Sequence, residues 1–183
     1  MILTADITIS DALTSEGKIL EGEVSEGKVS EAKISETGEP DDDDVPEPSL
    51  LKIWANAAYL NKKPAVASLL VTTSTEIQNL NKQYRDKDKA TNVLSFPMQS
   101  PKEVDVCLLG DIVLCAAVIE QEAVQQSKNR TSHWAHMVVH GMLHLQGYDH
   151  IQNDEAEVME RLEINILNQL GFDNPYDDGD EKR

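Results

Sequence analysis

The sequence predicts an α+β domain in which about five helices pack on one small mixed β-sheet. Short runs of apolar and β-branched residues, typical of strands, are separated by stretches with the 3.6-residue apolar period of helices. One helical stretch is apolar almost all round, which is typical of a helix buried in a domain core. The order of the strands in the sheet cannot be read from the sequence. The predicted strands are 2–9, 65–72, 91–98 and 106–114.

The chain divides into a core and two acidic flanks. It has 183 residues and a net charge of −17, and residues 15–48 alone carry twelve acids and three lysines, a net charge of −9. We expect 1–13 to supply the first core strand, 14–48 to be a disordered acidic low-complexity insertion, 49–172 to form the core and 173–183 to be a frayed acidic tail. A small β-solenoid is the alternative for the insertion. Because the core is nearly balanced in charge, a nucleic-acid partner is not excluded.

The first half of the core contains two predicted helices. Ser49 is placed to cap a helix over 50–61. Thr73 and Glu76 have the spacing of a capping box for the second helix. The inward-facing residues expected on the first helix are Leu51, Trp54, Ala55 and Ala58. Those expected on the second are Ile77, Leu80 and Tyr84.

In the second half, proline and glycine set the limits of the elements. Pro97 closes a strand and places it at a sheet edge. Gly110 inside the next strand indicates a bulge or a close approach of another backbone. A helix over 115–128 follows, and the last helix, capped by Asn153, runs to Leu170. Its predicted core stripe is Met159, Leu162, Ile166 and Leu170.

All five histidines lie between His133 and His150. His136, His140 and His144 are each four residues apart, so they stack along one face of the buried helix. Leaving a buried polar group without a partner costs about 1–3 kcal/mol. The imidazoles therefore need partners.

A metal ion would provide such a partner. His140 and His144 can bind one ion, Gly147 can end the helix, and His150 can return as a third ligand. Three neutral imidazoles leave the fourth position of a tetrahedral zinc open, as in catalytic sites. The alternative is a set of satisfied core histidines. The spacing also matches metzincin proteases, but Gly141 occupies the position of their catalytic glutamate, which argues against peptide hydrolysis.

Basic residues are densest in the segment before the third strand. The cluster consists of Lys82, Arg85, Lys87 and Lys89. It can be a surface for a polyanion or a solvated loop offset by Asp86 and Asp88.

The cysteines and the N-terminus bear on compartment. Eight residues of extended chain would hold Cys107 and Cys115 about 26 Å apart, too far for a disulfide, so they indicate a reducing compartment. The N-terminal segment lacks the features of a signal peptide, and no apolar run has transmembrane length. We expect a cytoplasmic protein with no membrane partner.

Three segments resemble one known family, the bacterial YbeY proteins. H-G-M-L-H-L-Q-G-Y-D-H is very similar to that family's H-G-x-L-H-L-x-G-Y-D-H signature. L-N-K-Q-Y-R-D-K-D-K-A-T-N-V-L-S-F-P and L-L-G-D-I-V-L-C resemble two further family blocks in the same order. Ala90 departs from the proline of many members, and the acidic insertion has no counterpart in the family pattern.

The resemblance implies a metal-dependent endoribonuclease core with zinc held by His140, His144 and His150. It implies that Arg85 and His140 are catalytic, and that the chain acts on single-stranded RNA. The implied role is maturation of the small-subunit rRNA 3′ end and ribosome quality control, with the small subunit or assembly factors as partners. Lys82, Lys87 and Lys89 would hold the RNA backbone. The alternatives are a non-catalytic zinc-containing ribosome-assembly factor and, less compatible with Gly141, a metalloprotease-like hydrolase.

Overall fold

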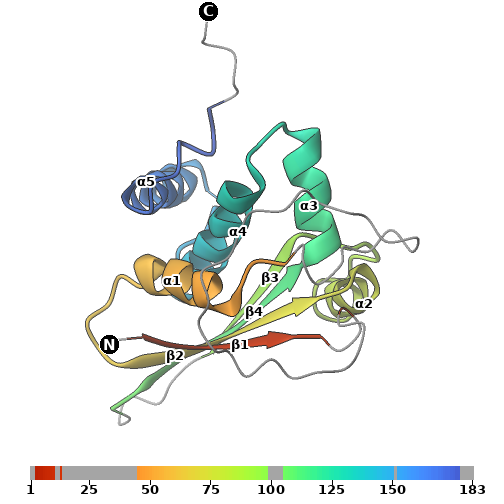
Figure 1. The fold of residues 1–183 in the computed structure, drawn as a ribbon. Helices are drawn as coiled ribbons and strands as arrows, with labels where there is room; N and C mark the ends of the chain where they lie inside the picture. The colour runs from red at the N-terminus through yellow and green to blue at the C-terminus, as the bar shows by residue number, and fades with distance from the viewer. Residues whose placement is uncertain (1–2, 11–12, 14–44, 99–104, 151, 178–183) are drawn as a thin grey trace, which may run out of the picture.

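The computed structural model describes residues 3–10, 13, 45–98, 105–150 and 152–177. Most of the predicted acidic insertion and the end of the predicted tail lie outside these residues. The described chain has the α+β fold class that the sequence predicts, with the strands and helices in the predicted order (Figure 1). In chain order they are β1 Leu3–Ile9, α1 Pro48–Ala58, β2 Ala65–Thr72, α2 Ser74–Arg85, β3 Val93–Pro97, β4 Cys107–Cys115, α3 Ala116–Gln125, α4 Arg130–Leu145 and α5 Asn153–Gln169.

The four strands form one mixed sheet in the order β1-β2-β4-β3. β1, β2 and β4 are parallel, whereas β3 pairs with β4 in the antiparallel direction. The predicted mixed sheet is therefore confirmed. β3 lies at an edge, as Pro97 indicated, because a proline cannot donate a hydrogen bond to a second neighbouring strand.

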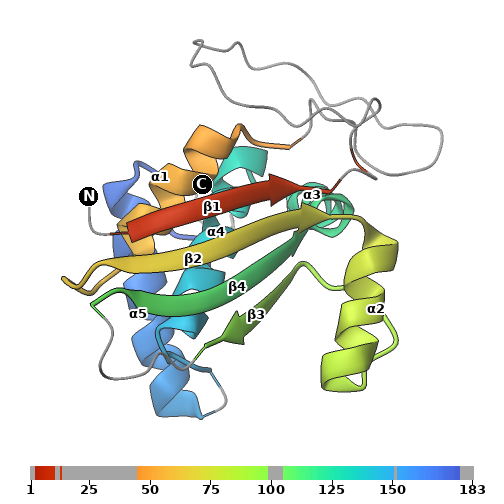
Figure 2. The same ribbon diagram turned by 90° about the horizontal axis from the view of Figure 1, so that it is seen from below.

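Helices cover both faces of this sheet. α1, α4 and α5 lie over one face with the main core beneath them, and α2 packs on the opposite face (Figures 1 and 2). The alternation of side chains along β4 separates the two layers. Ile112 and Leu114 belong to the main core, whereas Val113 and Cys115 join a smaller cluster with Ile77 of α2.

α1 begins one residue before the predicted cap. Pro48 is its first residue and Glu47 its N-cap, so the prediction that Ser49 caps the helix is wrong. A proline suits the first helical turn because the backbone N–H that it lacks would have no partner within the helix there. The helix also ends earlier than predicted, at Ala58. The predicted apolar stripe is confirmed as buried and comprises Leu51, Trp54, Ala55 and Ala58.

α2 has the predicted capping box, in which Thr73 and Glu76 exchange hydrogen bonds between side chain and backbone. The prediction that Tyr84 faces inward is wrong, since its side chain is 60% exposed. The last turn of α2 lies over the edge strand, where Tyr84 packs edge to face on Phe96 of β3, with ring centroids 5.1 Å apart. Asn81 is buried instead and donates its amide to the carbonyl of Lys89 at 2.8 Å.

Gly110 lies where two strands approach too closely for a side chain. Its φ is +122°, and a β-carbon there would lie 2.1 Å from the carbonyl oxygen of Phe96. The pairing of β2 with β4 shifts register between Val66 and Ala67, opposite this point. The prediction of a bulge or a close backbone approach is confirmed, and both features are present.

Candidate metal centre

α4 is the buried helix that carries four of the five histidines. It begins at Arg130, because the Asn129 side chain caps it by accepting from the Ser132 backbone N–H at 3.1 Å. Along most of its length its side chains are buried. Even so, no helix in the described part of the chain combines the length and the apolar character needed to cross a membrane.

The turn after α4 returns the chain toward the helix. Gly147 has a φ of +90°, and the Tyr148 N–H reaches back to the Leu143 carbonyl at 3.1 Å. This is the glycine-terminated helix end that the sequence predicts. Asp149 then accepts the backbone N–H of His150 at 2.8 Å. The described contact of Asp149 therefore shapes the turn and does not go to an imidazole.

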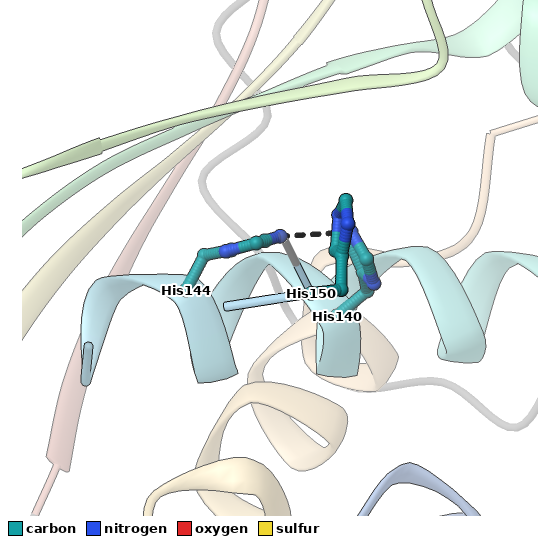
Figure 3. Close-up of side chains that lie close together, drawn as sticks. All are labelled: His140, His144 and His150. Carbon is teal, nitrogen blue, oxygen red and sulfur yellow. Dashed lines mark hydrogen bonds between the residues drawn. The ribbon is translucent and has the colours of Figure 1, made fainter. Parts of the chain in front are cut away.

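The structure brings His140, His144 and His150 together, as predicted. One ligand atom from each lies within 4.8 Å of the others. The Nε2 atoms of His140 and His144 are 3.1 Å apart, and the His150 ring lies beside both (Figure 3). His140 and His144 are half-buried and His150 is exposed, so the group opens to solvent.

The donor set fits a divalent transition metal. Two nitrogens bound tetrahedrally at 2.0–2.1 Å from one zinc are separated by about 3.3 Å, close to the observed approach of His140 to His144. The pKa of His144 is lowered to about 4. Burial is the largest cause, and the neighbouring His140 and His150 add to it. A neutral imidazole offers a lone pair, which is the form that binds metal.

A buried carboxylate supports this group from α5. Glu163 has no exposed surface, and its Oε1 lies 2.7 Å from Nδ1 of His140. Burial alone would raise the pKa of Glu163, but hydrogen bonds from His136 and His140 outweigh it and lower the pKa to about 2. Glu163 is not among the site residues predicted from the sequence. The available signal was a charged residue four positions after Met159, on the apolar stripe of a helix.

The two remaining histidines of α4 only partly fit the alternative of satisfied core histidines, because each has a carboxylate partner at Nε2 but a buried Nδ1 without a partner among the described residues. His133 pairs with Glu122 at 3.0 Å, and His136 lies 3.4 Å from the second oxygen of Glu163. Burial lowers the pKa of His136. His136, His140 and Glu163 also come within 4.8 Å of one another. There His140 presents Nδ1 in a hydrogen bond, which leaves its Nε2 for the three-histidine group.

Gly141 is where a zinc protease would carry its catalytic glutamate, and the packing leaves no room for one. A β-carbon at Gly141 would lie 2.9 Å from Cγ2 of Ile112, a fully buried side chain of β4. Ser95 of β3 donates its hydroxyl to the Gly141 carbonyl at 3.3 Å. α4 therefore lies directly against the sheet at this residue, and this packing is incompatible with a protease-type general base.

The predicted basic cluster lies at the end of α2 and in the turn after it. Arg85, Lys87 and Lys89 are exposed. Lys82 differs from them, because its Nζ lies 2.6 Å from Asp88. The hydrogen bond from Lys82 holds the pKa of Asp88 below its usual value. Part of the Lys82 charge is thus offset locally, which weakens its expected role in RNA binding relative to the other three residues.

The edge strand connects the basic cluster to the histidines. Consecutive residues of β3 make the two contacts: Ser95 bonds to Gly141 of α4, and Phe96 packs on Tyr84 of α2. Successive side chains of a strand point to opposite faces. The histidine helix and the basic end of α2 therefore lie on opposite faces of the same edge strand.

The chain is similar to known proteins. A family model described as endoribonuclease YbeY matches residues 48–171. A curated protein from Alteromonas mediterranea named endoribonuclease YbeY is 52% identical over 136 residues, which cover 73% of this chain and 86% of that protein. This chain belongs to the YbeY family. The solution structure of TM1509 from Thermotoga maritima is 23% identical, with a TM-score of 0.43 over 74% of this chain and 88% of that one.

The YbeY match extends from the start of α1 to just after α5. It includes the basic cluster, the three histidines and Glu163. β1 and the segment around Tyr176 lie outside the matched range, although both pack on the domain in the structure. The YbeY resemblance expected from the histidine motif and the two further blocks is therefore confirmed.

Proposed function

We propose that this chain is a zinc-dependent endoribonuclease that cleaves single-stranded RNA. Its proposed role is maturation of the 3′ end of small-subunit rRNA and ribosome quality control. The observation that carries the proposal is the convergence of His140, His144 and His150 at a solvent-facing end of α4. The names of the matched family and relative support RNA as substrate.

In this proposal the three imidazoles bind the zinc. His140 is also a catalytic residue, because it binds the metal that would activate the water. Three protein ligands are the number that catalytic zinc sites use. When bound, the metal would supply Lewis acidity and an activated water for phosphodiester hydrolysis. The residues of the chain orient the metal, keep the ligand imidazoles neutral and hold the RNA.

Arg85 is proposed to clamp the scissile phosphate, and this role requires the RNA to pass around the edge strand β3, because α4 and the end of α2 lie on opposite faces of that strand. Its guanidinium is exposed at the last position of α2, and a planar fork can make two parallel hydrogen bonds to one phosphate. Its positive charge would stabilise the negative charge that grows on the phosphate during cleavage. Lys87 and Lys89 would contact the backbone on either side, with Lys82 contributing less because of Asp88.

The exposed ring of Tyr84 favours the proposal that the RNA substrate is single-stranded. Most of its ring is exposed, and its contact with Phe96 supports it from one side. Unpaired bases stack on such aromatic surfaces, whereas the bases of a duplex are already stacked on one another. The adjacent Arg85 would bind the phosphate of a nucleotide whose base rests on Tyr84.

The proposed partners and place of action follow from the substrate. The chain would meet rRNA on the ribosome small subunit or with its assembly factors, in the cytoplasm. Cys107 and Cys115 form no disulfide with each other, which suits a reducing compartment.

The test is metal analysis and RNase assay on the same samples of the wild-type and His144→Ala proteins. We expect about one zinc per chain in the wild type, and loss of both metal and cleavage in the variant. His133→Gln is the matched control, because it removes an imidazole from the same helix outside the three-histidine group. It should keep both properties.

Two results would contradict the proposal. Cleavage that persists in metal-free His144→Ala would make the activity independent of this site. Unfolding of the wild type on metal removal, with no cleavage in the zinc-loaded protein, would favour a structural zinc and an assembly factor.

A further inference from the structure

Glu163 is buried between α4 and the segment that follows α5. Three groups surround its carboxylate: His140 Nδ1 at 2.7 Å, His136 Nε2 at 3.4 Å and the Tyr176 hydroxyl. A buried carboxylate is costly unless donors surround it. The Glu163 carboxylate thus depends on contacts from two elements other than its own helix.

The contact between Glu163 and His140 determines which nitrogen can bind metal. An ionised carboxylate can only accept hydrogen bonds, so the proton on His140 must be on Nδ1. Nε2 then carries the lone pair, and Nε2 is the atom that lies 3.1 Å from Nε2 of His144. The same hydrogen bond opposes rotation of the His140 ring. Outer carboxylates commonly fix ligand histidines in this way.

Tyr176 is held in place by its own segment. Its backbone N–H bonds to Asn174 at 3.1 Å, and the Asn174 amide donates to Asp177 at 2.7 Å. The Tyr176 ring packs edge to face on His136, with centroids 5.5 Å apart. The predicted frayed tail thus includes a described stretch with a specific contact to Glu163, and residues 178–183 lie outside the described part.

We propose that Glu163 is a positioning residue for the metal ligand His140, and that Tyr176 holds Glu163 in its bonding position. The segment after α5 thereby completes the metal site from outside the family-matched range. This inference rests on the proposed function, since it assumes that the three histidines bind metal. The simpler explanation is that Glu163 and Tyr176 only stabilise the packing of α5 on α4.

The experiment measures zinc affinity of the full chain by competition with a chelating dye, for the wild type, Glu163→Gln and Tyr176→Phe. Glu163→Gln keeps the shape of the side chain but can present an NH₂ group to His140, so we expect zinc to bind about 10–100-fold more weakly. Tyr176→Phe keeps the ring on His136 and removes only the hydroxyl. We expect a smaller loss in the same direction.

Glu122→Gln is the matched control. Glu122 is a partly buried carboxylate that pairs with His133 of the same helix, away from the three ligands. If Glu163 acts only through packing, its effect on zinc affinity should follow from the loss of folding stability alone. Glu122→Gln and Glu163→Gln variants that lose the same free energy of unfolding should then lose the same zinc affinity. The positioning role predicts that only the Glu163 and Tyr176 variants change the visible absorption spectrum of the cobalt-substituted protein.

A direct readout covers the case in which Glu163→Gln does not fold. Long-range ¹H–¹⁵N NMR spectra of the metal-free wild type report which ring nitrogen of His140 carries the proton. A proton on Nδ1, with a shift of the neutral tautomer population toward Nε2–H in Tyr176→Phe, supports the inference. A proton on Nε2 in the wild type overturns it, as does unchanged zinc affinity in a folded Glu163→Gln.

These readouts separate this inference from the nuclease proposal. Zinc affinity, cobalt spectra and NMR require no RNA. A wild type that binds zinc in the predicted way but cleaves no RNA would leave the Glu163 role standing and reject the nuclease. A wild type that binds no metal would reject both.

Discussion

Gly141 of α4 and Ile112 of β4 are in such close contact that a β-carbon on Gly141 would lie 2.9 Å from Cγ2 of Ile112. Both residues are fully buried or nearly so. Gly141→Ala should therefore lower the free energy of unfolding by about 1 kcal/mol. Overpacking costs about 1–3 kcal/mol, and the better helix propensity of alanine returns about 1 kcal/mol. Urea denaturation at pH 7 measures the change.

A double-mutant cycle isolates the contact between these two residues. Ile112→Ala removes the atoms that the new methyl group would meet, so Gly141→Ala should cost less in that background than in the wild type. Equal costs in the two backgrounds would show that the loss arises elsewhere on α4.

The capping box of α2 predicts a pH-dependent contribution to stability. Hydrogen bonds to Glu76, chiefly from Thr72, lower its pKa from the usual 4.5. A carboxylate with a depressed pKa stabilises the fold above its unfolded-state pKa, and that stability is lost as pH falls through the folded-state pKa. Glu76→Gln should cost about 1 kcal/mol at pH 7, the usual scale for a helix cap.

The comparison of wild type and Glu76→Gln is made by denaturation at pH 7 and again well below pH 4. The difference between the two proteins should shrink at the lower pH, because Glu76 is then protonated in the wild type. A difference that stays constant over this range would mean that the charge of Glu76 has no part in the cap.

Arg85→Ala should reduce the rate of RNA cleavage at saturating substrate by about 100-fold, the scale for removing one donor to a developing negative charge. The fold should be unaffected, since the side chain is exposed. Arg85→Lys should restore little of the rate, because an ammonium cannot make the paired hydrogen bonds of a guanidinium. Single-turnover kinetics separate this effect from binding. Full cleavage by Arg85→Ala would reject the role.

Tyr84→Ala should weaken binding of a short single-stranded RNA by about 1–3 kcal/mol, the usual contribution of one stacked base. Tyr84→Phe should bind like the wild type, because it keeps the ring that rests on Phe96. Fluorescence anisotropy in the presence of a chelator measures binding without cleavage. If alanine and phenylalanine variants bind equally well, no base stacks at this position.

Substitutions of the lysines in the basic cluster should change the salt dependence of RNA affinity by different amounts. Lys87→Gln and Lys89→Gln should each reduce the slope of log affinity against log salt by about 0.7 for single-stranded RNA. Lys82→Gln should reduce it less, because Asp88 lies 2.6 Å from its ammonium. Lys52→Gln, an exposed lysine of α1, is the control and should leave the slope unchanged. Equal effects from Lys52 and Lys87 would indicate that RNA has no preferred path over α2.

Features that depend on neighbours along the chain could be predicted from the sequence alone. His140 and His144 lie on one face of any helix that contains them, and a glycine after the last turn returns the chain far enough for His150. The capping box of Thr73 and Glu76 is equally local, which is why it was predictable. The same is true of the strand and helix segments, because their periodicity is carried by adjacent residues.

Features that depend on how the helices and strands pack could not be predicted in this way. Glu163 reaches His140 across 23 residues, and the approach depends on how α5 crosses α4. Tyr84 fits the apolar period of its helix, yet it is exposed because the last turn of α2 lies over the sheet edge. Such placements result from the packing of many side chains together, so no local pattern encodes them. The three histidines of the candidate site could therefore be predicted from the sequence, whereas the contact of Glu163 with His140 could not.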